Sequence, residues 1–441
     1  MRDQKRETLR IWFFVYFFLI GFNLSPILAA KDGVPPNVHV VSVGETQLYH
    51  YSNGSDFVNI RIIILGGANN YLKKYEGIES LALDAMLVGG SKFHPRDSLQ
   101  AIFEECHAQV SAMAGLDFSV VDFSCPQVLL EYAWPVFIRL VCYPSFETEA
   151  FKLIQIRYYK ELTEAEKLPA EQLKRVSFER YLKGHPYERH PVGSVKALSV
   201  ISREMVVSYY KALMVNSRIR IVSAGNLTDS TLEALASSFQ DFSTGKFVNR
   251  SVLNRTFSKT QIASKQTAVS TCTIRGVLAA PPGNSSETLA AELLVALVHD
   301  KIAENLNSQT VDFSIGYLPG FQGLIVLEAE SYNPYGFALL LQQQIQQIRS
   351  KPLPEEIIVA KKRLLFRKNI ESFETGNGQI QWLTQGVVYN KWIEISQLEE
   401  KLQLITADQL QKIAKFWLIR WQWILLGNFP NNIHHPFEKI P

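Results

Sequence analysis

The heptapeptide VISREMV at residues 200–206 recurs in similar form as LITADQL at residues 404–410. In each copy a hydroxyl residue stands before a run of helix formers, which is the pattern of a capped helix start. Each predicted helix leads into an apolar strand, at 219–224 or at 421–426, that stops at a Gly-Asn pair. The two copies are about 200 residues apart, so this stretch predicts a duplicated chain.

The beginnings of the two halves also correspond. Residues 60–65 and 272–280 have the apolar pattern of strands, and each run is followed by a turn and a helical stretch. A second strand follows in each half, at 118–125 and at 324–330, ahead of paired helical segments. Strands segregated from long helices are typical of antiparallel sheets. We therefore predict an α+β fold of two homologous half-domains, each a mostly antiparallel sheet with helices packed on one face.

Length and composition fit this division. A chain of 441 residues is too long for one ordinary core, and 47% hydrophobic with 20% charged residues is typical of a folded protein. The balance of 45 basic to 42 acidic residues argues against nucleic acid as a partner. The predicted parts are a signal peptide at 1–30, an N-terminal domain at 31–244, a polar linker at 245–258, a C-terminal domain at 259–430 and a tail at 431–441.

The N-terminus has the parts of a secretory signal. Basic residues up to Arg10 precede a short apolar run at 11–22, and the stretch ends in the small residues Ala29 and Ala30. The apolar run is short for a membrane span, which needs about 20 residues. The sequence therefore predicts an exported protein, periplasmic or secreted, with an uncleaved N-terminal membrane anchor as the alternative.

The four cysteines are few for this length, and the absence of a C-x-x-C pair from the sequence argues against a zinc knuckle or a thioredoxin-like site. Export permits disulfides, but the sequence does not choose among the pairings of Cys106, Cys125, Cys142 and Cys272. The apolar neighbours of Cys125 and Cys142 favour buried free thiols.

Three local motifs occur in order along the chain. They are SAMAGLD at 111–117 before a strand, PSF at 144–146 before a helix, and GHPY at 184–187 ahead of Pro191 and Gly193. With the duplication, they resemble the pitrilysin/insulinase family of zinc peptidases, in particular the short bacterial branch similar to mitochondrial processing peptidase. The resemblance covers most of the chain and implies a clam-shell of two halves around a peptide-holding chamber.

Active members of this family carry H-x-x-E-H on a helix. Residues four apart share one helix face, so both imidazoles reach one zinc ion, and the glutamate takes a proton from the metal-bound water. The stretch GIESLALDAM at 77–86 matches this helix. The match places Ser80 and Asp84 where the histidines belong, Leu83 where the base belongs, and Glu161 where a distal glutamate ligand belongs.

These replacements remove the chemistry of the motif. A serine hydroxyl is a poor zinc ligand, and the pair Asp84 and Glu161 offers hard oxygen donors that suit calcium or magnesium better. Leu83 accepts no proton, whereas a general base contributes roughly 10²- to 10⁴-fold to a rate. We therefore expect no peptidase activity by this route and no cofactor, with zinc only in a partner subunit.

The resemblance also implies an arginine and a tyrosine after a helix of the second half. In the matching stretch, Asn307 stands near the arginine position and Phe313 near the tyrosine position, with Ser314 as the alternative for the latter. In paired bacterial members the zinc-less subunit often supplies these two residues. Neither is kept here, so a direct role in the transition state is not expected.

Family members hold a peptide as an added strand on a sheet edge. The matching edge in this chain includes Ala108, Val110, Ala112 and Ala114. Backbone pairing needs no particular side chain, so it survives loss of the zinc site. Extended peptides are therefore predicted ligands.

The histidines do not point to a second metal site. His185 and His190 flank Glu188, but the prolines around them mark a turn. His299 and Asp300 are typical of a surface pair on a helix.

The sequence thus favours a non-catalytic peptidase homologue that pairs with an active zinc-bearing homologue as a heterodimer, or with itself. One alternative is a stand-alone structural or peptide-binding protein. Another is a hydrolase with an altered oxygen-ligand metal site at Asp84 and Glu161.

Overall fold

The computed structural model describes residues 33–240, 242, 244–247 and 252–441. The predicted signal peptide at 1–30 lies outside these residues. Residues 35–441 form one compact unit, and the fold described below is that of this unit. Among the described helices, none is long and apolar enough to cross a membrane.

The first half forms a six-stranded sheet in the order β1-β2-β6-β3-β5-β4. Neighbouring strands are antiparallel, except that β2 and β6 run parallel. The strands are β1 (Val38–Val43), β2 (Thr46–Ser52), β3 (Phe57–Leu65), β4 (Gln109–Met113), β5 (Phe118–Pro126) and β6 (Ile219–Gly225). The strands predicted at 60–65 and 118–125 are therefore confirmed as parts of β3 and β5.

The second half repeats this sheet with five strands in the order β7-β11-β8-β10-β9. The strands are β7 (Gln261–Gln266), β8 (Cys272–Ala279), β9 (Thr310–Pro319), β10 (Gly323–Ser331) and β11 (Gln422–Gly427). The parallel pair β11 and β7 takes the place of β6 and β2. Strand for strand the order matches β2-β6-β3-β5-β4, with β1 as an addition to the first half. The predicted duplication and fold class are confirmed.

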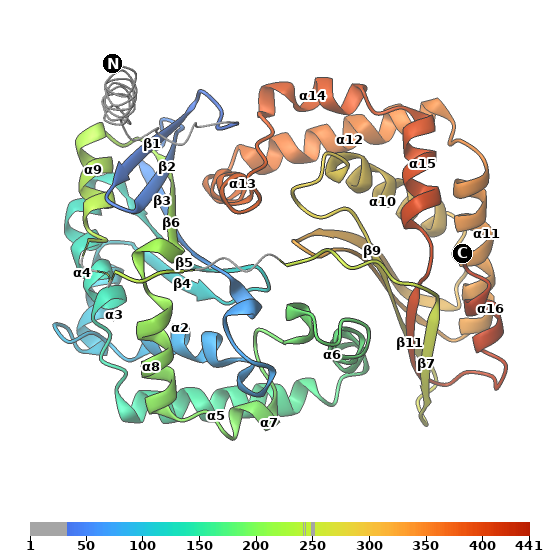
Figure 1. The fold of residues 1–441 in the computed structure, drawn as a ribbon, viewed down its shortest axis with the longest axis horizontal. Coiled ribbons are helices and arrows are strands. Elements are labelled where there is room, and N and C mark those ends of the chain that lie inside the picture. The colour runs from blue at the N-terminus through green and yellow to red at the C-terminus, as the bar shows by residue number, and fades with distance from the viewer. Residues whose placement is uncertain (1–32, 241, 243, 248–251) are drawn as a thin grey trace, which may run out of the picture. The chain divides into compact units, whose positions relative to one another are not determined.

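Part of the helix order is duplicated as well, since α2, α4, α5 and α6 recur as α10, α11, α12 and α13 (Figure 1). The first half contains η1 (Gly67–Asn70), η2 (Lys73–Tyr75), α2 (Ile78–Val88), α3 (Arg96–Glu105), η3 (Gln127–Leu129), α4 (Leu130–Cys142), α5 (Thr148–Ala165), α6 (Pro169–Tyr181), η4 (Pro186–Glu188), α7 (Val195–Leu198), α8 (Arg203–Leu213), η5 (Asn216–Arg218) and α9 (Asp229–Ser237). The second half contains α10 (Thr288–Ala303), α11 (Pro334–Ser350), α12 (Glu355–Phe373), α13 (Gly376–Tyr389), α14 (Ile395–Gln403), α15 (Ala407–Trp417) and α16 (His434–Glu438).

The two helix starts predicted from the repeated heptapeptides are confirmed. The Ser202 hydroxyl accepts a hydrogen bond from Met205 N at 3.3 Å at the start of α8. The Thr406 hydroxyl accepts one from Gln409 N at 3.2 Å at the start of α15. Each cap satisfies a backbone donor that the first turn of a helix leaves free.

Each half has its own hydrophobic core between its sheet and its helices. Successive side chains of a strand point to opposite faces of the sheet. Alternate residues of β3, namely Ile60, Ile62 and Ile64, therefore enter the first core, as Ile274 and Leu278 of β8 enter the second. The intervening residues of these strands face the other side of each sheet.

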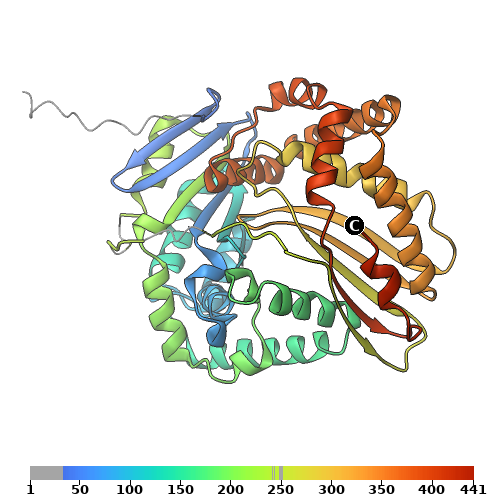
Figure 2. The ribbon, with the colours of Figure 1, turned by 45° about the vertical axis from the view of Figure 1, so that its right-hand side comes forward.

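That other side is covered by a helix from the opposite half. Helix α6 of the first half packs on β8 and β11, and α13 of the second half packs on β3 and β6. Figure 1 shows both helices between the two sheets, and Figure 2 shows α13 beside the first sheet from another side. Tyr181 of α6 donates to the carbonyl of Trp423 at 2.6 Å, and Arg61 of β3 donates to Gln381 of α13 at 3.0 Å. The halves are thus interlocked by an exchange of helices.

A buried carboxylate also joins the halves. Asp117, just before β5, accepts hydrogen bonds from the hydroxyls of Tyr187 at 2.7 Å and Tyr389 at 2.9 Å and from Phe321 N at 2.9 Å. Burial raises the pKa of Asp117, and these three hydrogen bonds oppose the shift. Because Tyr187 ends the GHPY turn and Asp117 ends SAMAGLD, two of the motifs found in the sequence meet at this junction.

Candidate functional site

Helix α2 carries three of the four positions that the resemblance matches to a zinc motif. It begins after Gly77, whose backbone is left-handed with φ 89°. A Cβ on Gly77 would lie 2.7 Å from Gly193 Cα, so the start of α2 and the connector after GHPY touch backbone to backbone. The helix is buried along most of its length, which fixes the direction of its side chains.

Two of the matched positions serve packing. Ser80 is buried, and its hydroxyl donates to the carbonyl of Pro191 at 2.8 Å. Leu83 is 1% exposed and belongs to the first core. A serine engaged with the connector and a leucine inside the core offer neither a metal ligand nor a base for a metal-bound water.

The other two matched positions, Asp84 and Glu161, both form ion pairs with an arginine of the same chain. Arg157 of α5 lies between them, with Nη2 2.5 Å from Asp84 Oδ2 and Nε 3.9 Å from Glu161 Oε1. The neighbouring Tyr158 donates its hydroxyl to Asp84 at 2.9 Å. Burial raises the pKa of Asp84, and the Tyr158 hydrogen bond and the Arg157 charge oppose the shift. A guanidinium therefore stands where the resemblance implies a metal ion.

These residues do not fit a zinc ion. Structural zinc sites take four ligands and catalytic ones three with a water, from Cys, His, Asp and Glu. The motif retains two carboxylates, and Glu161 is 61% exposed on the surface of α5. Across the described ranges no group of three or more His, Cys, Asp or Glu side chains is arranged to hold a metal ion. The side chains on α2 and α5 therefore support ion pairing rather than metal activation of water.

A buried acid on α2 escaped the comparison of motifs. Glu79 is fully buried and accepts hydrogen bonds from the hydroxyls of Ser119 and Tyr209 and from Asn70 Nδ2, the last at 3.1 Å. Burial raises its pKa, while these hydrogen bonds and the charge of Arg218 oppose the shift. The signal in the sequence was an acid near the start of a mostly apolar run. Glu79 ties α2 to β5 and α8, so it positions the helix.

Strand β4 lies at the edge of the first sheet and packs against α2. It pairs with β5 on one side, and no strand of the described residues pairs with its other side. Of the predicted peptide contacts, Val110 and Ala112 lie in β4 and face the first core, and Ala108 and Ala114 border the strand. Met113, on the opposite face, is 66% exposed. An open strand edge thus lies beside the altered motif.

The matched positions of the second half serve turn formation and packing. Asn307 precedes β9, and its Oδ1 accepts a hydrogen bond from Gln309 N at 3.1 Å. The ring of Phe313 stacks on His299 with the ring centroids 5.5 Å apart. Ser314 is exposed on β9. These side chains carry neither the positive charge nor the phenol that the resemblance implies.

The histidines and cysteines singled out in the sequence have structural roles. His185 accepts a hydrogen bond from Tyr187 N at 3.1 Å and caps η4, and burial lowers its pKa to about 4. His299 forms the predicted pair with Asp300, with Nδ1 3.3 Å from Oδ1. All four cysteines are free thiols; the predicted burial is confirmed for Cys125 and is wrong for Cys142, which is half-buried at the end of α4, and Cys106 and Cys272 are buried as well.

The fold is similar to several solved peptidase structures. A peptidase M16 inactive domain from Pseudomonas fluorescens matches with a TM-score of 0.81 and 16% identity, over 89% of this chain and 99% of that one. A protease from Helicobacter pylori matches with a TM-score of 0.80 and 11% identity, over 89% and 100%. The periplasmic protease PqqL from Escherichia coli matches with a TM-score of 0.76 and 12% identity, over 91% of this chain and 46% of that one.

At these identities the likeness shows the fold alone. The fold implied by the resemblance to pitrilysin-like peptidases is confirmed. No protein-family model matches the sequence, and no curated protein sequence matches it.

Proposed function

We propose that this chain is an exported, non-catalytic homologue of the M16 peptidases that holds extended peptides and pairs with an active zinc-bearing homologue. The observation that carries the proposal is an altered centre in an intact duplicated fold: Leu83 lies in the core, and Arg157 bridges Asp84 and Glu161. The likeness to an M16 inactive domain supports the non-catalytic part. The likeness to a periplasmic protease supports export.

Strand β4 is the element that we propose to hold the peptide. An edge strand presents a row of backbone N–H and C=O groups that pair with an added strand, independently of side chains. Because β4 packs against α2, a peptide on this edge would lie beside the altered motif. The exposed Met113 is the side chain of β4 best placed to contact such a peptide.

Backbone methylation of the ligand tests this mode of binding. A fluorescent extended peptide is titrated with the full chain, together with two isomers N-methylated at alternate residues. One isomer loses the N–H groups that would pair with β4, and the other loses those that face away. Strand addition requires one isomer to bind at least about tenfold more weakly than the other, because several hydrogen bonds are lost. Equal affinities of the three peptides would exclude β4 pairing.

Isolation from the native source tests the pairing. An affinity-tagged chain at its native level should elute as a complex with a protein that carries H-x-x-E-H. A matched control is the same tag on a chain with Phe416→Asp, a surface change on α15 (63% exposed), which lies on the outer side of the second core. Elution as a monomer without a peptidase would contradict the pairing and favour a stand-alone peptide-binding protein. A homodimer would favour self-association.

A further inference from the structure

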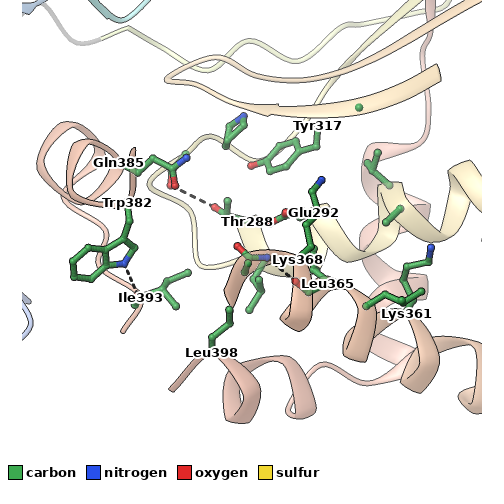
Figure 3. A pocket seen from close by; sticks show the side chains of 18 of the residues that line it. Thr288, Glu292, Tyr317, Lys361, Leu365, Lys368, Trp382, Gln385, Ile393 and Leu398 are labelled. Carbon is green, nitrogen blue, oxygen red and sulfur yellow. Dashed lines mark hydrogen bonds between the residues drawn. The ribbon is translucent and has the colours of Figure 1, made fainter. Parts of the chain in front are cut away.

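The second half contains a cavity of about 690 Å³ between α10, α12, α13 and β9 (Figure 3). Sites for small ligands usually measure roughly 300–1,000 Å³, so this cavity has the size of a binding site. It is separate from α2 and from the β4 edge. No step of the proposed function uses it.

The duplication gives this cavity a counterpart in the first half. Helix α10 follows β8 as α2 follows β3, and α12 holds the place of α5. In the first half Arg157 and Tyr158 of α5 reach across to Asp84 of α2. When α5 and α12 are aligned at their first residues, Arg157 and Tyr158 match Leu364 and Leu365, which line the cavity. The space that Arg157 and Tyr158 bridge in the first half is therefore part of a cavity in the second, where Lys361 and Asp300 pair at its border.

Two charged side chains face this space. Glu292 of α10 and Lys368 of α12 line the cavity, and Figure 3 shows them together beneath Tyr317. Within the described part of the chain neither makes a hydrogen bond or an ion pair. Burial raises the pKa of Glu292, and the charge of Lys368 opposes the shift. In the alignment of α5 with α12, Lys368 matches Glu161, so an acid of the first half is replaced by a base.

Other polar groups of the cavity are already engaged. Lys361 pairs with Asp300, and Trp382 donates its indole N–H to the carbonyl of Ile393 at 2.8 Å. With that N–H engaged, Trp382 joins Ile393 and Leu398 in an apolar wall on the side away from the charged pair (Figure 3). The cavity therefore offers a ligand the opposite charges of Glu292 and Lys368 at one end and apolar surface at the other.

We propose that this cavity binds an α-amino acid with an apolar side chain, whose ammonium and carboxylate lie on one carbon and so reach both charges at the same end of the cavity. Glu292 takes the ammonium group, Lys368 takes the carboxylate, and the apolar part lies against the Trp382 wall. Burying the Glu292 carboxylate without a hydrogen bond is unfavourable, the Lys368 charge offsets only part of that cost, and a ligand ammonium that donates to Glu292 removes more of it. Opposite charges at one end favour a zwitterion over a simple anion or cation, since hydrogen bonds between charged groups are the strong ones. The inference does not depend on the proposed pairing or on β4.

Calorimetric titration of the full chain with matched ligands tests the proposal. The panel contains leucine, phenylalanine, Leu-Leu and Leu-Leu-Leu, each also with an acetylated amine and with an amidated carboxylate. Either cap should weaken binding at least about tenfold, because each removes one charge-assisted contact. The length series distinguishes a free amino acid from a short peptide. Equal binding of capped and free forms, or no binding of any member at millimolar concentration, would overturn the proposal.

Two variants assign the contacts. Glu292→Gln should lower the affinity for ligands with a free amine and leave acetylated ligands unchanged, and Lys368→Met should act in the same way on the free carboxylate. Glu161→Gln, at the position that matches Lys368 in the first half, is the control that leaves binding unchanged. Uniform loss with all ligands would contradict the assignment. If a variant does not fold, the capped and free ligands still decide the question on the unmodified chain.

Discussion

The first half fills the space between α2 and α5, and the second half leaves the space between α10 and α12 open. In the first half Arg157 and Tyr158 join the two helices through Asp84. In the second half leucines occupy the matching positions and border a cavity of about 690 Å³. Both halves keep the same strand order, whereas the side chains at these positions differ. Different side chains at matched positions thus accompany a bridged pair of helices in one copy and a cavity in the other.

The largest expected effect is at Leu83, the position that the resemblance matches to a catalytic base. Leu83→Glu places a carboxylate in the first core without a partner, and it should reduce the free energy of unfolding by about 4 kcal/mol or more. Leu153→Glu on α5, at a side chain that is 61% exposed, is the control and should change it by less than about 0.5 kcal/mol. Urea unfolding followed by circular dichroism measures both. A small effect of Leu83→Glu would show that α2 tolerates a carboxylate at this position without strain.

Glu79 tests how firmly the first half holds α2, because its hydrogen bonds keep this helix in place. Glu79→Ala leaves Asn70, Ser119 and Tyr209 without their shared acceptor, and it should cost about 3 kcal/mol of unfolding free energy. Glu79→Gln, which keeps the size of the side chain, should cost less. Equal losses of unfolding free energy for Glu79→Ala and Glu79→Gln would contradict this, because Gln fills the space of the side chain and Ala does not.

The same residue gives a pH dependence with a defined sign. Burial raises the pKa of Glu79 above its usual 4.5, so the native state keeps the proton to a higher pH than the unfolded chain. The contribution of Glu79 to the free energy of unfolding is full below about pH 4.5 and is lost as the pH rises through the pKa that Glu79 has in the native state. The difference in unfolding free energy between the unmodified chain and Glu79→Gln should therefore shrink as the pH rises from 4.5 to 8. A difference that grows over this range would contradict the raised pKa.

The ion pairs on the matched helices should contribute less. Arg157→Met removes the cation beside Asp84, and a cost of about 1 kcal/mol is expected, because the arginine side chain is 49% exposed and screened by solvent. Lys361→Met is the comparison variant in the second half. It breaks the ion pair between Lys361 of α12 and Asp300 of α10. A double-mutant cycle of Arg157→Met with Asp84→Asn isolates the pair energy. A coupling energy of zero would show that Arg157 does not stabilise the closed site.

The smallest expected effect is that of added metal. A site occupied at about 100 times its Kd would add about 2.7 kcal/mol to the free energy of unfolding and raise Tm measurably. Zinc, calcium and magnesium should each leave Tm unchanged, because Arg157 already forms ion pairs with the carboxylates of Asp84 and Glu161. A rise in Tm that Asp84→Asn abolishes would instead support the hydrolase with an oxygen-ligand metal site.

Much of the fold followed from local sequence. The repeated helix starts at Ser202 and Thr406 and the apolar runs of β3 and β8 are short-range patterns, and the structure has them at those places. The exchange of α6 and α13 did not follow. The periodicity of a helix shows which of its faces is apolar, but it does not show whether the sheet beneath belongs to the same half.

The sequence predicted which positions of the motif carry other residues, but it did not predict the contacts that those residues make. From the sequence, Ser80, Leu83 and Asp84 predict a helix without zinc-binding histidines and without a base, and in the structure Ser80 and Leu83 serve packing. The role of Arg157 depends on a contact with Asp84 between residues far apart in the sequence, and no spacing rule reports such a pair. The charged pair Glu292 and Lys368 is missed for the same reason, since α10 and α12 approach each other only in the folded chain.

The exchange of α6 and α13 has a consequence for how the chain can be divided. Each half completes its sheet with an arm from the other, as two subunits of a swapped dimer do, so the duplicated chain has the design of an isologous dimer fused into one polypeptide. Neither half on its own would bury the outer face of its sheet. A protease that cuts the chain between α9 and β7 would therefore release no free domain, and two fragments expressed separately would fold by finding each other.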